Sequence, residues 1–225
     1  ELLLLDEPSE GLAPLIVQPV RLVIDGSVVT MQTYAQQIGY ANIVTLNGGS
    51  TLTLTGDNSL AGVVFNSSGG TATPTLNVGG TLTVTGDIAS TPANVVVVPV
   101  ITGGSALNLD GKATHNFTVN VQTGATFRTG LTISSVIQNG GFTKLGGGVL
   151  ELSGANTFTG GLNINAGAVL STAGQGIGGA ANTVTIANNA ALWLNTTVGG
   201  ANNTIAVAAS GGTIASVGGD RTLSA

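Results

Sequence analysis

Carboxylates at repeated positions are the first residues in this sequence that could do chemistry. Asp57 and Asp87 each close a Thr-Gly-Asp triplet, and the segments that end at them, 45–57 and 75–87, are identical at 10 of 13 positions. If these copies stack in register, the two carboxylates lie about one strand spacing apart and could share a cation, with Asp110 as a third member. The favoured alternative is a turn in which each Asp hydrogen-bonds to its own backbone.

The single histidine is a second candidate for catalysis. His115 lies between Thr114 and Asn116, where the sequence predicts a polar loop. A Ser-His-Asp triad would need Asp110 and a serine, and no G-x-S-x-G motif supports one. We therefore expect His115 to be an ordinary loop residue.

Aromatic residues make up only 4 % of the chain, and three of them could form a platform for stacking on a sugar ring. The three are Trp193, Phe127 and Phe158. Alternation along the strand puts Trp193 on the face opposite Leu192 and Leu194, which favours an exposed indole. Packing in the core or as a cap is the favoured alternative for these rings.

The chain carries ten acidic and five basic residues, a net charge of −5. A nucleic-acid-binding surface needs a basic stripe, so we expect no nucleic-acid partner. The absence of cysteine excludes disulfide scaffolds and thiol catalysis, and a zinc finger is excluded with only one histidine. We expect no cofactor and no catalytic residue, and Asp57 and Asp87 are the only candidates for a metal.

Repetition predicts the fold. Looser copies of segment 45–57 continue through the chain at a spacing of roughly 20–30 residues, each an alternating strand, a Gly or Asn turn and a second short strand. Period-two alternation places the leucines of 51–55 inward and its threonines outward. One coil cannot bury its own inner face, whereas stacked coils share a core. The pattern therefore predicts an all-β fold, a parallel β-helix of eight or so coils, over residues 26–225.

The first 25 residues differ in composition and hold 6 of the 15 charges. In them, four leucines precede Asp6 and Glu7, as in a buried strand that delivers two carboxylates at its end. Residues 1–18 resemble the Walker B strand and D-loop of ABC-transporter ATPases, particularly the branched-chain amino acid importers. The resemblance implies that Asp6 would organise magnesium and Glu7 would polarise water. Because the chain has no GxxxxGK[ST] phosphate loop, we interpret 1–25 as an inactive Walker B fragment or junction segment, irregular or helical.

A second resemblance lies in residues 142–170, which read FTKLGGGVLELSGANTFTGGLNINAGAVL. This stretch resembles the passenger-associated repeat of bacterial autotransporters, G-x-G-x-L-x-L-S-G-x-N-T-Y-T-G-G-T-x-V-x-x-G, with Phe158 for the usual Tyr and Leu162 for the usual Thr. Weaker relatives of the repeat extend over most of 40–225. The resemblance implies a right-handed β-helix displayed at a Gram-negative cell surface. The residues that carry the motif are Gly154, Asn156, Thr157, Phe158, Thr159, Gly160, Gly161 and Gly167.

The resemblance also implies a function: a non-catalytic stalk or adhesin-type passenger segment, extracellular and associated with the outer membrane. We expect an outer-membrane barrel in the same parent chain and an unidentified glycan or host protein as surface ligand. Exposed β-helix ends predict self-association. The main alternative is a polysaccharide-active β-helix enzyme, which would need a cleft with at least three clustered carboxylates. A non-functional ABC-ATPase fusion fragment is the other alternative.

Overall fold

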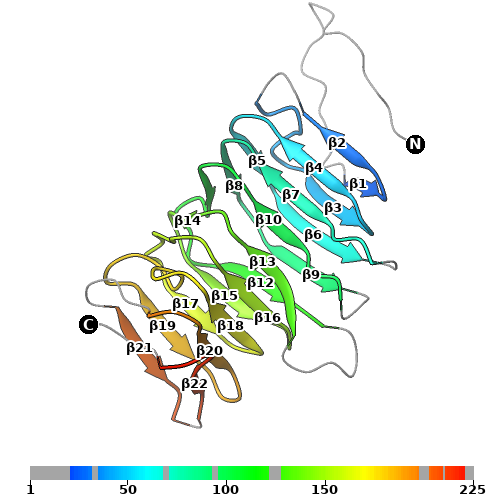
Figure 1. The fold of residues 1–225 in the computed structure, drawn as a ribbon. Coiled ribbons are helices and arrows are strands. Elements are labelled where there is room, and N and C mark those ends of the chain that lie inside the picture. Colours follow the sequence, from blue (N-terminus) through cyan, green and yellow to red (C-terminus); the bar gives the residue numbers. More distant parts are fainter. Residues whose placement is uncertain are drawn as a thin grey trace, which may run out of the picture.

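The computed structural model describes residues 21–31, 35–67, 71–92, 96–121, 128–197, 203–209 and 211–220. Over these ranges the chain forms 22 β-strands and no helix. The strands wind into coils that stack from the N-terminal to the C-terminal end as one elongated body (Figure 1). No helix in the described part of the chain could cross a membrane.

The first long sheet contains nine strands, one from each coil. Every neighbouring pair is parallel. In spatial order they are β1 (Leu22–Asp25), β3 (Ile43–Asn47), β6 (Gly62–Ser67), β9 (Ile88–Pro92), β12 (His115–Val119), β15 (Phe142–Leu145), β17 (Leu162–Ile164), β19 (Thr183–Ile186) and β21 (Thr204–Val207).

The second long sheet repeats this arrangement with the strand that follows in each coil, again as nine parallel strands. Its members are β2 (Val28–Thr30), β4 (Thr51–Leu54), β7 (Thr75–Val78), β10 (Val100–Thr102), β13 (Thr129–Ile133), β16 (Val149–Leu152), β18 (Ala168–Ser171), β20 (Ala191–Leu194) and β22 (Thr213–Ser216).

Within the described residues, a third, short sheet closes the side of four coils. Its strands are β5 (Asn58–Leu60), β8 (Thr81–Val84), β11 (Ala106–Asn108) and β14 (Ile137–Gln138). The second to fifth coils are therefore three-sided, and the later coils close their third side without a described strand. The all-β parallel solenoid predicted from the repeats is confirmed.

Alternation along each strand builds the core as expected. In β4 the two leucines are fully buried and the threonines are partly exposed. Leu52 lies over Leu76 of the next coil, and such pairs repeat along the stack as one continuous apolar ladder. Burying a leucine side chain contributes about 1.5–3 kcal/mol, so this shared ladder stabilises the stack of coils substantially.

The two nearly identical segments are not stacked on one another, which corrects the expected register. Segment 45–57 runs through the first and second long sheets, whereas 75–87 runs through the second long sheet and the short sheet. β7 pairs with β4 at a separation of 24 residues, not 30. The alternating strand-turn-strand unit fits either corner, because both corners need only one buried and one exposed face. The length of chain around the coil, rather than sequence identity, sets the register.

The solenoid also begins earlier than the expected boundary after residue 25, because β1 already pairs with β3 from Leu22 onward. Residues 1–20 lie outside the described ranges, and with them the expected Walker B segment and its irregular or helical conformation.

Candidate functional site

Asp57 and Asp87 lie at different corners, so the carboxylate pair considered as a candidate cation site does not form. Asp57 lies at the corner between β4 and β5, and its Oδ1 accepts a hydrogen bond from the Thr81 N–H at 2.7 Å. Asp87 lies between β8 and β9 and accepts from the N–H and the side-chain amide of Asn116, at 2.9 and 3.3 Å. Each carboxylate ties its corner to the next coil rather than to its own turn.

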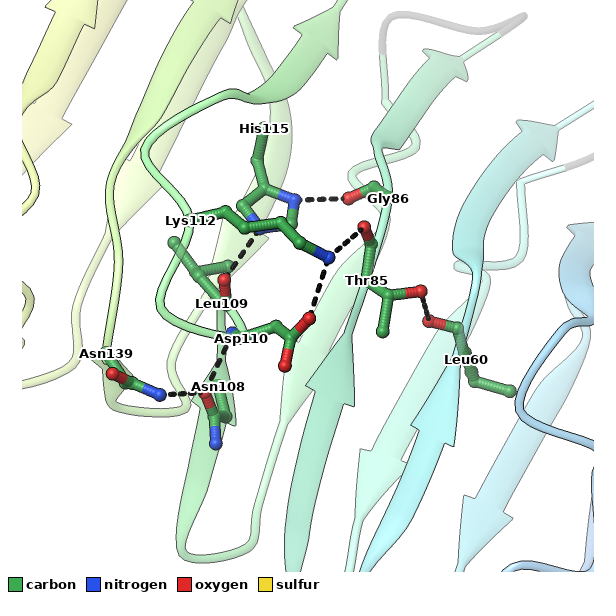
Figure 2. Close-up of polar contacts among 9 residues, drawn as sticks. All are labelled: Leu60, Thr85, Gly86, Asn108, Leu109, Asp110, Lys112, His115 and Asn139. Atoms are coloured by element: carbon green, nitrogen blue, oxygen red, sulfur yellow. Dashed lines mark hydrogen bonds and ion pairs between the residues drawn. The ribbon is translucent and has the colours of Figure 1, made fainter.

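Asp110 lies in a polar cluster at the corner between β11 and β12, drawn in Figure 2. Its Oδ2 accepts a hydrogen bond from Lys112 Nζ at 2.7 Å, and Lys112 also donates to the Thr85 carbonyl at 3.4 Å. The hydrogen bond from Lys112, and then its charge, lowers the pKa of Asp110. Because both side chains are exposed to solvent, water screens this ion pair, and the pair alone does not anchor the corner.

His115 is the buried member of the same cluster, and its expected position in a polar loop is wrong. It is the first residue of β12, is 2 % exposed, and pairs with Phe142 of β15. Its Nδ1 lies 2.6 Å from the Gly86 carbonyl and its Nε2 lies 2.7 Å from the Leu109 carbonyl (Figure 2). Both ring nitrogens are therefore engaged by backbone, which leaves none for a catalytic triad.

The candidate aromatic platform is not assembled on the surface in the described residues, and core packing, the favoured alternative, is what Phe158 shows. Phe158 is fully buried and packs against Phe142, with ring centroids 5.3 Å apart. Phe142 in turn stacks on Phe117 at 4.2 Å, so the phenylalanines form an internal ladder. Trp193 lies on the outer face of β20, where it packs against a small apolar cluster that includes Val149. Phe127 lies outside the described residues.

Lys144 is a buried ionisable side chain that the sequence did not lead us to expect. It is fully buried in β15, between Phe117 of β12 and Ile164 of β17. Its ammonium donates to the carbonyls of Leu145, Gly146 and Ala166 at 2.8, 2.7 and 3.0 Å. Burial lowers the pKa of Lys144 to about 7. The available signal was the alternation itself, because Lys144 follows the buried Phe142 by two residues and must face inward.

The ammonium of Lys144 joins the turns of two successive coils. Leu145 is the last residue of β15 and Gly146 begins the turn between β15 and β16, whereas Ala166 belongs to the equivalent turn between β17 and β18. Three carbonyl oxygens satisfy all three N–H groups of the ammonium. This arrangement holds a corner together and offers no open position for a substrate.

Asn156, a motif residue, performs the same task on the third side of the solenoid. Its side chain is fully buried; Oδ1 accepts from the Ile137 N–H and Nδ2 donates to the Gly176 carbonyl, both at 2.8 Å. The next backbone N–H, that of Thr157, bonds to the Ile137 carbonyl at 2.9 Å. The Asn156 side chain and the Thr157 N–H therefore bond to Ile137 of β14, the last strand of the short sheet. They occupy the place where the next strand of that sheet would pair with β14.

The remaining motif residues shape the corners around Asn156. At Gly154, a Cβ would lie 2.6 Å from the Ser135 carbonyl oxygen, so the close approach of the two coils requires glycine. Gly167 has a positive φ of 64° in the turn after β17. Thr157, Thr159 and Gly160 are exposed, and the Gly161 N–H donates a hydrogen bond to Asn182 Oδ1 at 3.0 Å.

The described ranges contain no metal site assembled from acidic, histidine or cysteine side chains. There, no group of three or more His, Cys, Asp or Glu side chains is close enough to hold a metal ion. Asp6 and Glu7 lie outside those ranges, so their assignment to a vestigial Walker B segment stays a prediction. A hollow of about 350 Å³ lies in the first coil and is mostly apolar, lined among others by Leu22, Val29 and Met31.

Parallel strands, one shared ladder and corners capped by buried side chains define a β-solenoid of stacked repeats. A family model described as the passenger-associated-transport-repeat matches residues 44–72 and 142–170. The chain therefore carries two autotransporter passenger-type repeats, and the second is the segment whose sequence resembled that family. No match covers residues 1–18, so the ABC-ATPase resemblance has no support. Neither the curated proteins nor the solved structures yield a match.

The two matched repeats place asparagine at the same point. Both span the same length, so that Asn58 of the first occupies the position of Asn156 in the second. Asn58 is also buried; its Oδ1 accepts from the Gln36 N–H at 3.1 Å, and its Nδ2 donates to two carbonyls of its own turn. In both repeats the asparagine Oδ1 accepts a hydrogen bond from a backbone N–H of the preceding coil. The motif asparagine thus holds each coil to the coil before it.

Proposed function

We propose that this chain is a non-catalytic shaft of an autotransporter passenger, exported and displayed at a bacterial cell surface, that holds another part of its parent protein away from the membrane. The observation that carries the proposal is the passenger-type repeat at 44–72 and 142–170 within an uninterrupted stack of coils. Nine strands at about 4.8 Å spacing give a shaft about 38 Å long. Its stiffness comes from parallel ladders that share one core.

The placement of acidic groups supports a non-catalytic role. Asp57, Asp87 and Asp110 lie at corners, where their carboxylates bond to backbone or to Lys112. Glu151 lies on the outer face of β16, bonded at 3.4 Å by the Thr132 hydroxyl. Glycoside hydrolysis needs two carboxyl groups facing each other across a cleft, and these residues are dispersed instead.

An adhesive role for the same shaft is supported by a polar row along the outer face of the second long sheet. Neighbouring members are linked in places, as by the bond from Asn77 Nδ2 to Thr53 Oγ1 at 3.2 Å and from the Ser134 hydroxyl to Thr102 Oγ1 at 2.8 Å. The row carries no charge, so a neutral glycan is a better fit to it than a charged polymer. Its members are Thr30, Thr53, Asn77, Thr102, Ser134, Ser153, Thr172 and Asn195.

Surface display tests the proposal. The chain is given an N-terminal epitope tag, fused upstream of an outer-membrane barrel, and expressed in a Gram-negative host. We expect antibody to label the tag on intact cells and proteinase K to leave a resistant core that spans the solenoid. The matched control is Leu150→Asp, which puts a carboxylate in the buried ladder and should make the displayed chain protease-sensitive. A wild-type chain that stays inside the cell, or is digested like the control, would overturn the proposal.

A further inference from the structure

A row of oxygen-bearing side chains crosses the first three coils, and it carries an inference that does not depend on a role as a shaft. Asp25 is the last residue of β1, Asn47 is the last residue of β3, and Asn66 is the last but one of β6. The strand register places these three residues side by side (Figure 1). The residue before each of them is buried in the core, so alternation turns the row to the outer face.

The middle side chain of this row holds an oxygen that lacks a hydrogen-bond donor. Asn47 Oδ1 is shielded from solvent, and no described residue donates to it. A carbonyl oxygen that has lost its water and gained no donor raises the free energy of the folded chain, so such an atom points to a partner outside the protein. Beside it, the Asp25 carboxylate has no basic partner among the residues that the structure describes.

Comparable rows elsewhere in the solenoid satisfy their oxygens from the next coil. Two coils further along this same row, Asn120 Nδ2 donates to the Thr91 hydroxyl at 3.4 Å. On the outer face of the second long sheet, the amide of Asn77 donates to a threonine hydroxyl of the coil before it at 3.2 Å. Asn66 is placed to donate to Asn47 Oδ1 in the same way and does not. The first three coils therefore leave their oxygens available to another ligand.

We propose that Asp25, Asn47 and Asn66 form a Ca²⁺ site that ties the first three coils together. Calcium takes carboxylate and amide oxygens as ligands, at about 2.3–2.6 Å. Side chains on one face of adjacent strands start about 4.8 Å apart, so an ion between two of them can contact an oxygen from each. Asp25 supplies the charge, Asn47 the shielded oxygen and Asn66 a further oxygen on the other side, with water in the remaining positions.

The charges around the row leave the site negative. Arg21 lies on the same strand four residues before Asp25, about 13 Å away along an extended chain, and its Nε donates to the Thr45 hydroxyl at 3.1 Å. Because the site holds a single carboxylate, we expect weak binding, with a Kd of about 10⁻³ M. Mg²⁺ gives up its water reluctantly and should bind more weakly than Ca²⁺.

NMR of the side-chain amides tests the site on the full chain without any variant. Calcium chloride, added after treatment with a chelator, should shift the amide signals of Asn47 and Asn66 saturably, with a midpoint at about 1 mM. The amide of Asn77 on the second long sheet is the internal reference and should not move. Asn47 signals that stay in place at roughly ten times this calcium concentration would overturn the proposal.

Three variants assign the binding to this row. Asp25→Asn removes the one charge and should weaken calcium binding about tenfold or more, whereas Asn47→Asp adds a second carboxylate and should tighten it about tenfold. Asp57→Asn is the matched control, because its carboxylate bonds to the Thr81 N–H at another corner, and it should titrate as wild type does. If Asp25→Asn and Asn47→Asp both bind calcium with the wild-type midpoint, the ion does not bind at this row and the proposal is wrong.

Discussion

The buried lysine gives a quantitative prediction about stability and pH. Lys144 is fully enclosed in an apolar ladder, and burial lowers its pKa from 10.5 to about 7. Below pH 7 the folded and unfolded states both carry the proton, so the fold bears the full cost of burying the charge. Between pH 7 and 10.5 the folded state gives up its proton first, so stability rises with pH over this window.

The size of the effect follows from the same shift. Each pKa unit corresponds to about 1.4 kcal/mol, so the rise across the whole window is on the order of 5 kcal/mol, with a slope of at most about 1.4 kcal/mol per pH unit. The three carbonyls around the ammonium favour the charged form and act against this rise. We therefore expect a measured slope nearer 1 kcal/mol per pH unit between pH 7.5 and 9.5.

Urea unfolding of wild type and Lys144→Met, repeated from pH 6 to pH 9.5, measures this slope. The Met side chain fills the same space without a titrating group, so the free energy of unfolding of the variant should lack the rise seen in wild type. Lys112→Met is the matched control, because Lys112 is exposed and its loss should leave the rise in place. If wild type and Lys144→Met differ by a constant amount at every pH, the assignment of the titration to Lys144 is wrong.

The other predictions concern the coil contacts and the cation hypothesis. Asn156→Ala removes the partners of a buried N–H and a buried carbonyl and should cost roughly 2–4 kcal/mol in urea unfolding, while Asn163→Ala on the outer face of β17 should change stability little. Phe142→Ala interrupts the phenylalanine ladder and should cost about 3–5 kcal/mol; a loss below 1 kcal/mol would show that the ladder does not hold the coils. Asp57→Asn and Asp87→Asn should respond to calcium or to a chelator in thermal melts as wild type does, because the two carboxylates lie at separate corners; a calcium-dependent shift lost in both variants would restore the cation site.

Much of the fold could be predicted from local pattern. The alternation of leucine and threonine in 51–55 fixes which face is buried, and it also places Lys144 inward after Phe142. Register could not be predicted in the same way. The copies 45–57 and 75–87 are nearly identical, yet they occupy different corners because the number of residues around the coil decides which strands meet. That number depends on the corner conformations of the whole coil, which no short segment contains.

The candidate site residues likewise could be predicted only where local pattern decides their environment. A polar neighbourhood suggested a loop for His115, but its partners are carbonyls of Gly86 and Leu109, one of them 29 residues away in sequence. Asp57 and Asp87 looked equivalent because their triplets match, and the stacking that separates them is a property of three dimensions. Motif residues such as Asn156 could be identified from the sequence. Their structural role could not, because their hydrogen-bond partners lie in neighbouring coils.

Distances between spin labels along the shaft test the central claim most directly. The chain has no cysteine, so two double-cysteine variants, one with Thr30 and Ser134 replaced and one with Thr30 and Asn195 replaced, can be labelled without other changes. These positions lie on one outer row in the first, fifth and eighth coils. A stack of coils at about 4.8 Å predicts backbone separations near 19 Å from Thr30 to Ser134 and near 34 Å from Thr30 to Asn195, both narrowly distributed. Broad distributions, or a second distance no longer than the first, would contradict a stiff solenoid shaft.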